Sequence, residues 1–220
     1  MDVQMFIVGP VQENCFLARL DGADRAIIID PGEEAPRLLR EIESRNLALE
    51  AILLTHTHFD HVGAVAPLAR ATGAPVYCPE IEVAVLQDIM AFVPWPGFGP
   101  FESWDPEHTV RGGETLELAG LTIDVVFTPG HSPGHVTYAV RPDPSSPESA
   151  HALFSGDVLF QGSVGRVDLP GGDWPTLLTS ITTLLDAYAD DTPVYPGHMG
   201  TTTLGAERAT NPFLAELSRR

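Results

Sequence analysis

The 220-residue sequence predicts an α/β protein made of two similar halves, each of which mixes strands with helices. Short apolar runs end at Gly, Pro or Asp, as strands do, and longer segments between them carry apolar residues at helical spacing. Each half must bury one face of a sheet, so we expect two sheets packed face to face with helices outside. At 44% hydrophobic and 19% charged residues, the chain suits a single domain over 1–220.

The expected elements follow from these patterns. In the first half we expect strands at 5–8, 14–20, 25–30, 51–55 and 75–78, and helices at 34–45, 60–72 and 80–90. In the second half we expect strands at 114–118, 121–128, 136–140, 152–155 and 193–195, helices at 174–188 and 205–209, and a Pro/Ser-rich hairpin tip at 141–150.

Residues 91–107 separate the two halves and break both patterns. Four prolines alternate there with five aromatic residues, and prolines at this density preclude regular structure. The segment is either a packed surface Ω-loop or an apolar wall or lid beside a site.

One short motif points to chemistry: His56-Thr57-His58-Phe59-Asp60-His61 holds three imidazoles and a carboxylate directly after an apolar run. Imidazole suits zinc, copper, iron and nickel, and a carboxylate adds a harder ligand. An H-x-H pair at a strand end can aim two imidazoles at one ion, and a D-H pair entering a helix can aim two ligands at a neighbouring ion. An exposed polar loop rarely concentrates histidine in this way, so the motif predicts metal binding.

Three more candidate ligands, His131, Asp157 and His198, each follow an expected strand within a Pro-Gly-His or Gly-Asp turn. Glycine lets the backbone bend at such turns, and strand-end loops on a rigid sheet can bring ligands together from distant parts of the sequence.

The order and spacing of these motifs, H-T-H-F-D-H, P-G-H, G-D and a second P-G-H, resemble the metallo-β-lactamase superfamily over nearly the whole chain. The resemblance implies a four-layer αβ/βα sandwich with a two-metal site at the edge between the sheets. By position it implies one metal on His56, His58 and His131, a second on Asp60, His61 and His198, and Asp157 bridging both. Such sites favour two zinc ions, although iron or manganese can enter them.

The remaining candidates are assigned supporting or no roles. His135 lies four residues after His131, and we expect it to support a ligand or to pack rather than to bind metal. The superfamily places an acid at the position of Asp30 to brace the metal loops. His108 and His151 border loops without a partner motif, and we expect ordinary surface residues there.

Two segments, 156–166 and 201–214, resemble the glyoxalase II (hydroxyacylglutathione hydrolase) branch of the superfamily. That resemblance implies a hydrolase that cleaves a small thioester by attack of a metal-bridging hydroxide, with Asp60 and Asp157 as the catalytic carboxylates. The branch binds the carboxylates of glutathione with a lysine and a tyrosine, at positions that here carry Arg166 and Asp168. Arg166 can grip a carboxylate through its bidentate fork, and Asp168 would repel one.

Full-length members of that branch continue into a C-terminal helical domain, and this chain stops at Arg220. It therefore resembles the compact single-domain subgroup, whose thiol carrier stays open. Two alternatives use the same motifs: a persulfide dioxygenase with a single iron, and a lactonase. A metal-dependent structural domain is a poor match, because structural zinc sites are usually rich in cysteine.

Charge and cysteine content bound the partners. The net charge of −18, with arginine as the only basic residue besides histidine, makes nucleic acid an unfavourable partner. Cys15 and Cys78 lie in apolar contexts, and we expect buried free thiols. The sequence has neither a signal-peptide pattern nor an apolar run of about 20 residues, so we expect a cytoplasmic protein without membrane contact, as a monomer or homodimer.

Overall fold

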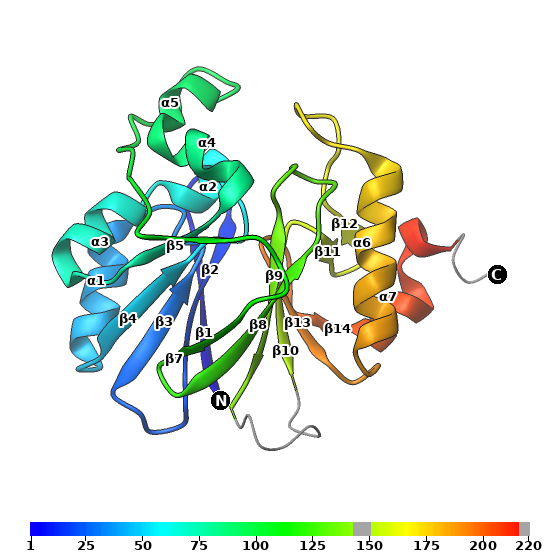
Figure 1. Ribbon diagram of the computed structural model, residues 1–220, viewed down its shortest axis with the longest axis horizontal. Helices are drawn as coiled ribbons and strands as arrows, with labels where there is room; N and C mark the ends of the chain where they lie inside the picture. The colour runs from blue at the N-terminus through cyan, green and yellow to red at the C-terminus, as the bar shows by residue number, and fades with distance from the viewer. Residues whose placement is uncertain (143–150, 216–220) are drawn as a thin grey trace.

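The computed structural model describes residues 1–142 and 151–215 and forms two sheets packed face to face with helices on both outer sides (Figure 1). The expected four-layer αβ/βα sandwich is confirmed. The expected hairpin tip at 141–150 lies, from residue 143 on, outside the described residues. Within the described residues, no helix is long and apolar enough to cross a membrane.

The first sheet has the strand order β1-β2-β3-β4-β5-β6. Its strands are β1 (Asp2–Val8), β2 (Glu13–Arg19), β3 (Arg25–Ile29), β4 (Ala48–Leu53), β5 (Val76–Pro79) and β6 (His108–Val110). The first three strands pair antiparallel, and β3 to β6 pair parallel. Each parallel pair requires a crossover. The first contains α1 (Ala35–Ser44), the second contains α2 (Phe59–Val62) and α3 (Val65–Thr72), and the third, between β5 and β6, is formed by residues 80–107.

The second sheet has the order β14-β13-β10-β9-β8-β7. Its strands are β7 (Thr115–Leu118), β8 (Leu121–Phe127), β9 (Val136–Arg141), β10 (Ala152–Gly156), β13 (Pro193–Pro196) and β14 (Thr202–Thr203). Next to it lie the small hairpin β11 (Leu159–Phe160) and β12 (Ser163–Val164), and the outer elements α6 (Trp174–Ala187), α7 (Leu204–Thr210) and the 3-10 turn η2 (Pro212–Leu214).

Strand direction explains why chemistry gathers at one edge. In the first sheet, β3 and β4 are parallel, so Asp30 and the H-x-H motif follow strand ends at the same edge. In the second sheet, β8 and β10 both pair antiparallel with β9, and β13 pairs parallel with β10. These three strands therefore run the same way, and the segments that carry His131, Asp157 and His198 all leave at one edge.

Alternating strand residues fill three apolar layers. On β3 and β4, Ile27, Ile29 and Leu53 face the second sheet, whereas Ile28 and Ile52 face α1 and α3. A third layer packs the second sheet against α6 and α7. Strands buried on both faces read as continuous apolar runs, which is why the sequence locates them well.

Two of the expected helices are broken. The helix expected at 60–72 is α2 and α3, separated at Gly63 and Ala64, because the Ala64 N–H donates to the carbonyl of Pro31 instead of continuing the first helix. The helix expected at 80–90 consists of η1 (Glu80–Glu82), α4 (Val83–Gln87) and α5 (Ile89–Phe92), which part at Asp88, where φ is −147° and ψ is 60°.

A buried carboxylate, Glu82 of η1, joins two loops that lie far apart in the sequence. It accepts hydrogen bonds from the Thr57 hydroxyl (2.8 Å), the Ser132 hydroxyl (2.7 Å) and the Gly134 N–H (2.7 Å), and the residue is 4% exposed. Thr57 lies inside the H-x-H motif, and Ser132 follows His131. Glu82 therefore fixes the distance between the loops after β4 and β8.

We expect Glu82→Ala to lower the free energy of unfolding by roughly 2–4 kcal/mol, because three buried donors lose their acceptor. Denaturant unfolding of the metal-free protein measures this. Glu82→Gln keeps an acceptor oxygen for Ser132 and Gly134 and should lose less than half as much. Glu80→Ala, at an exposed neighbour paired with Arg111, is the control and should stay near the parent. Equal losses for all three variants would contradict the role assigned to Glu82.

Both cysteines are free and buried, as expected, and each is 0% exposed. Burial raises the pKa of both thiols well above the ordinary range, and Glu13 raises that of Cys15 further. We expect neither thiol to react with a disulfide reagent such as Ellman's in the folded protein at mildly alkaline pH, and both to react after denaturation. Rapid reaction of one thiol without loss of structure would show that the layer around it opens.

Candidate metal centre

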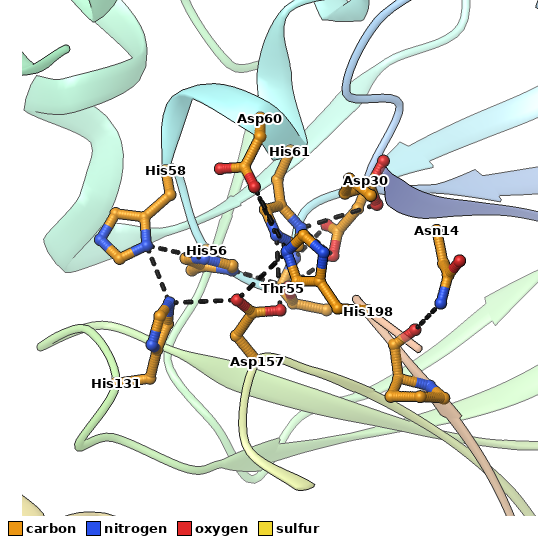
Figure 2. Close-up of polar contacts among 12 residues, drawn as sticks. Asn14, Asp30, Thr55, His56, His58, Asp60, His61, His131, Asp157 and His198 are labelled. Carbon is orange, nitrogen blue, oxygen red and sulfur yellow. Dashed lines mark hydrogen bonds and ion pairs between the residues drawn. The ribbon is translucent and has the colours of Figure 1, made fainter. Parts of the chain in front are cut away.

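The seven predicted ligands lie together at the edge between the two sheets (Figure 2). His56 and His58 come from the loop after β4, and Asp60 and His61 from α2. His131, Asp157 and His198 come from the loops after β8, β10 and β13. Each half of the chain therefore contributes to the cluster, as the strand directions require.

Three imidazoles form the first group. His58 Nδ1 lies 3.2 Å from His56 Nε2 and 2.8 Å from His131 Nε2. A tetrahedral zinc ion with bonds of about 2.0–2.1 Å needs ligand atoms only about 3.3 Å apart, so this spacing fits a single ion. His56, His58 and His131 can thus hold a metal as one set.

The second group pairs two imidazoles with a carboxylate. Asp60 Oδ2 lies 3.3 Å from His198 Nε2 and 3.9 Å from His61 Nε2. These atoms also lie within 4.8 Å of one another, so Asp60, His61 and His198 form a second set that could hold a cation.

Asp157 lies between the two groups. Its Oδ2 is 3.5 Å from His131 Nε2 in the first group and 3.6 Å from His198 Nε2 in the second, and its Oδ1 is 3.5 Å from His61 Nε2. Asp157 Oδ1 and His61 Nε2 are buried without a hydrogen-bond partner among the described residues. A buried polar atom without a partner costs free energy. A cation between these two atoms would supply the missing partner to both.

Hydrogen bonds to the far ring nitrogens turn the imidazoles toward the cluster. His131 Nδ1 donates to the Arg166 carbonyl (2.8 Å), which leaves Nε2 as the free nitrogen. Asp30 accepts from the Thr55 N–H (2.7 Å) and hydroxyl (2.6 Å) and lies 3.1 Å from His61 Nδ1. The Thr55 oxygen in turn lies 3.0 Å from His56 Nδ1. Such partners fix the tautomer and orientation of metal-binding histidines.

The structure also groups Asp30, His56 and His61 as a possible third set. Asp30 already accepts from Thr55 through both oxygens, so its lone pairs are largely used within the protein. Its position under His56 and His61 agrees with the bracing role expected from the sequence.

The pKa shifts differ between the two groups. Burial, followed by the neighbouring imidazoles, lowers the pKa of His56 well below its usual value and that of His58 to about 3. His56 and His58 are therefore neutral, as metal binding requires. Burial also disfavours the charge on His61 and His198, but the carboxylates beside them outweigh it and raise both pKa values. In the second group, protons on His61 and His198 therefore balance the negative charge of the neighbouring carboxylates. A bound cation would balance that charge in place of the protons.

Glycine is required beside these side chains for space. A Cβ at Gly197 would collide with Asp157 Oδ1 and with the ring of His61, and a Cβ at Gly32 would collide with the Asp60 carbonyl. The glycine before His198 was expected to let the chain turn, but its φ is not positive, and close approach of the ligands is the stronger constraint.

His135 is fully buried behind the cluster, in keeping with its expected supporting role. Its Nε2 accepts from the Asp157 N–H (3.1 Å), and its Nδ1 lies 3.1 Å from the Thr128 hydroxyl. His108 and His151 lie away from the cluster, against Tyr77 and Tyr188.

Besides Glu82, sequence reasoning missed two buried polar residues at the site, of which Asn14 braces a ligand loop. Asn14 donates to the carbonyls of Pro196 (2.9 Å) and Met199 (2.8 Å) on both sides of His198. Glu13 is 0% exposed, lies 3.7 Å from His61 Nδ1, and burial raises its pKa well above the usual value. The sequence signal that could have located them is the polar pair Glu13-Asn14 directly before the apolar residues of β2.

A cavity of about 930 Å³ opens over the ligands and is lined mainly by apolar side chains. Residues 91–95 form part of its wall, while Phe98, Phe101 and Trp104 pack against the first apolar layer. The 91–107 segment thus combines the two expected roles: it is a wall of the cavity at its start and a packed loop beyond. Arg166 also lines the cavity.

Comparison with known proteins agrees with this geometry. The family model of the metallo-β-lactamase superfamily matches residues 8–198. The hydroxyacylglutathione hydrolase GloC of Haemophilus influenzae is 37% identical over 216 residues, which cover 97% of this chain and 98% of GloC.

Two solved structures are also similar. The BLEG-1 B3 metallo-β-lactamase has a TM-score of 0.87 at 37% identity, covering 97% of this chain and all of that one. TTHA1623, in a di-iron-bound form, has a TM-score of 0.80 at 42% identity, covering 96% of this chain and all of that one. The sequence match, the fold and the histidine-rich cluster lead to one assignment: this chain belongs to the metallo-β-lactamase superfamily and is a metallo-hydrolase.

Proposed function

We propose that the protein is a two-metal thioesterase of the glyoxalase II type. The observation that carries the proposal is Asp157, whose carboxylate lies within 3.6 Å of ring nitrogens from both groups while one of its oxygens lacks a partner among the described residues. A single structural metal site would not require a carboxylate shared between two complete sets. The similarity to GloC supports the choice of thioesters within the superfamily.

In this proposal His56, His58 and His131 would hold one ion, Asp60, His61 and His198 would hold the other, and Asp157 would serve both. When bound, a metal pair lowers the pKa of water to roughly 7 and polarises a carbonyl oxygen. Zinc suits the nitrogen-rich set, and the di-iron form of TTHA1623 supports iron as another occupant.

The chain's own groups orient the reaction. Asp60 is 15% exposed at the cavity side, so it can accept a proton from water in addition to its first role as a ligand. The cavity walls hold the substrate with its carbonyl over Asp157. Water adds its oxygen to the acyl carbon, the C–S bond breaks, and the products are a carboxylic acid and a thiol. A thiol has a pKa near 8.5, so its thiolate leaves without a dedicated acid.

We expect Asp157→Ala to lose metal and to reduce thioester hydrolysis by more than about 100-fold, because removal of even an indirect metal partner costs 10–100-fold. Metal analysis after gel filtration and hydrolysis of S-lactoylglutathione and simple thioesters measure both effects. The control is Asp21→Ala, an exposed carboxylate at the turn between β2 and β3. Parent-level activity in Asp157→Ala would overturn the proposed role.

Metal content separates this proposal from the single-iron dioxygenase. We expect about two ions per chain, loss of hydrolysis on treatment with chelator, and recovery on adding zinc, because both groups present complete ligand sets. One iron per chain together with oxygen-dependent turnover of a persulfide would favour the dioxygenase. Assays with a lactone and a β-lactam alongside the thioesters test the remaining hydrolases, of which BLEG-1 is the similar β-lactamase.

A further inference from the structure

We propose that the cavity binds a thioester with an apolar, uncharged acyl group, and that the Arg166–Asp168 pair disfavours substrates that bring a carboxylate to this wall. The inference rests on the proposed function and names its substrate class. It alters the role expected for Arg166, from gripping a carboxylate to forming part of a neutral wall.

Two separate parts of the chain contribute apolar side chains to the cavity wall. Ile81, Val85, Ile89 and Trp95, from η1, α4, α5 and the segment after it, line one side, and Leu169 and Pro170 line another. The volume of about 930 Å³ is at the upper end of the usual range for small-molecule sites. Apolar surface of this extent favours burial of hydrocarbon.

Arg166 has both its fork and its face occupied. Its Nε and Nη2 donate to the two carboxylate oxygens of Asp168 at 2.6 and 2.7 Å, and its guanidinium lies over the ring of Trp95, 5.4 Å from the centroid. The hydrogen bond from Arg166 lowers the pKa of Asp168 to about 2, so Asp168 stays charged at ordinary pH. A substrate carboxylate would therefore have to compete with the Asp168 carboxylate for the Arg166 guanidinium.

Among the described residues that line the cavity, Arg166 is the only lysine or arginine side chain that could receive an anion at this wall. The chain has no lysine, and its net charge is −18. Anionic substrates are therefore repelled by the field of the whole protein.

Trp95 connects this wall to the ligand-bearing turn. Its ring lies 6.2 Å from that of Phe59, which stands between His58 and Asp60 in the sequence, and 6.5 Å from that of Phe98. These ring contacts hold Trp95 in place relative to the ligand-bearing turn. A longer acyl chain would gain contact with Trp95 and the apolar side chains beside it.

The first test is a series of acyl chains on one uncharged thiol. With the metal-loaded protein, kcat/KM is measured for the acetyl, butanoyl, hexanoyl and octanoyl thioesters of N-acetylcysteamine and for S-lactoylglutathione. We expect kcat/KM to rise about two- to fourfold per added methylene until the wall is covered, and the best of the series to exceed S-lactoylglutathione. Trp95→Ala should flatten this dependence on chain length while changing acetyl hydrolysis much less. A flat series in the parent would overturn the inference.

The second test is charge-specific. We expect Asp168→Asn, which frees the Arg166 fork, to raise kcat/KM for S-lactoylglutathione relative to the hexanoyl thioester by about tenfold, the scale of one charge-assisted hydrogen bond. Adding Arg166→Ala to that variant should cancel the gain. Asp21→Asn removes the same charge at a distant turn and should leave the ratio unchanged. An unchanged ratio in Asp168→Asn would contradict the role of the pair.

The two proposals fail differently. If the metal-loaded parent hydrolyses no thioester, the proposed function falls and this inference falls with it. If the parent hydrolyses S-lactoylglutathione in preference to every uncharged thioester, the thioesterase function stands and the assignment of an apolar substrate is wrong.

Discussion

The site depends on one buried carboxylate, Asp30, and on the hydrogen bonds that it accepts. The Thr55 hydroxyl has a single proton and donates it to Asp30, so its oxygen can only accept from His56 Nδ1. His61 Nδ1 faces the same carboxylate. One acid beneath the cluster therefore selects which nitrogen is free on a ring of each group, directly for His61 and through Thr55 for His56. Metal binding by His56 and His61 requires that these nitrogens be free.

Around that carboxylate, the fold brings ligands from distant parts of the sequence to one place. Parallel strands in the first sheet and three co-directional strands in the second deliver ligands to one edge, and Glu82 and Asn14 then set the spacing of the loops. These braces are polar groups in otherwise apolar surroundings. Their hydrogen bonds gain strength from the low local dielectric, and for the same reason the loops cannot shift without leaving donors unpaired.

Much of this could be predicted from the sequence, because ligands that follow strand ends show as polar motifs directly after apolar runs. His131, Asp157 and His198 were located in this way. The breaks at Ala64 and Asp88 could not be predicted, because each depends on tertiary contacts that local spacing does not encode. The same holds for Glu82, whose three partners lie 25 to 52 residues away, and for β6, which is three residues long and recognisable only by its pairing with β5.

Each set of ligands draws on both halves of the chain. His58 and His131, 73 residues apart, share the first set, and His198 joins Asp60 and His61 in the second. A cation in either set is therefore a reversible cross-link between the two sheets, comparable in topology to a disulfide across a long loop. Its binding free energy adds to the cohesion of the sandwich by about 4 kcal/mol at a thousandfold excess over the dissociation constant. The availability of metal in the cell would then govern how long the folded molecule survives as well as how fast it turns over.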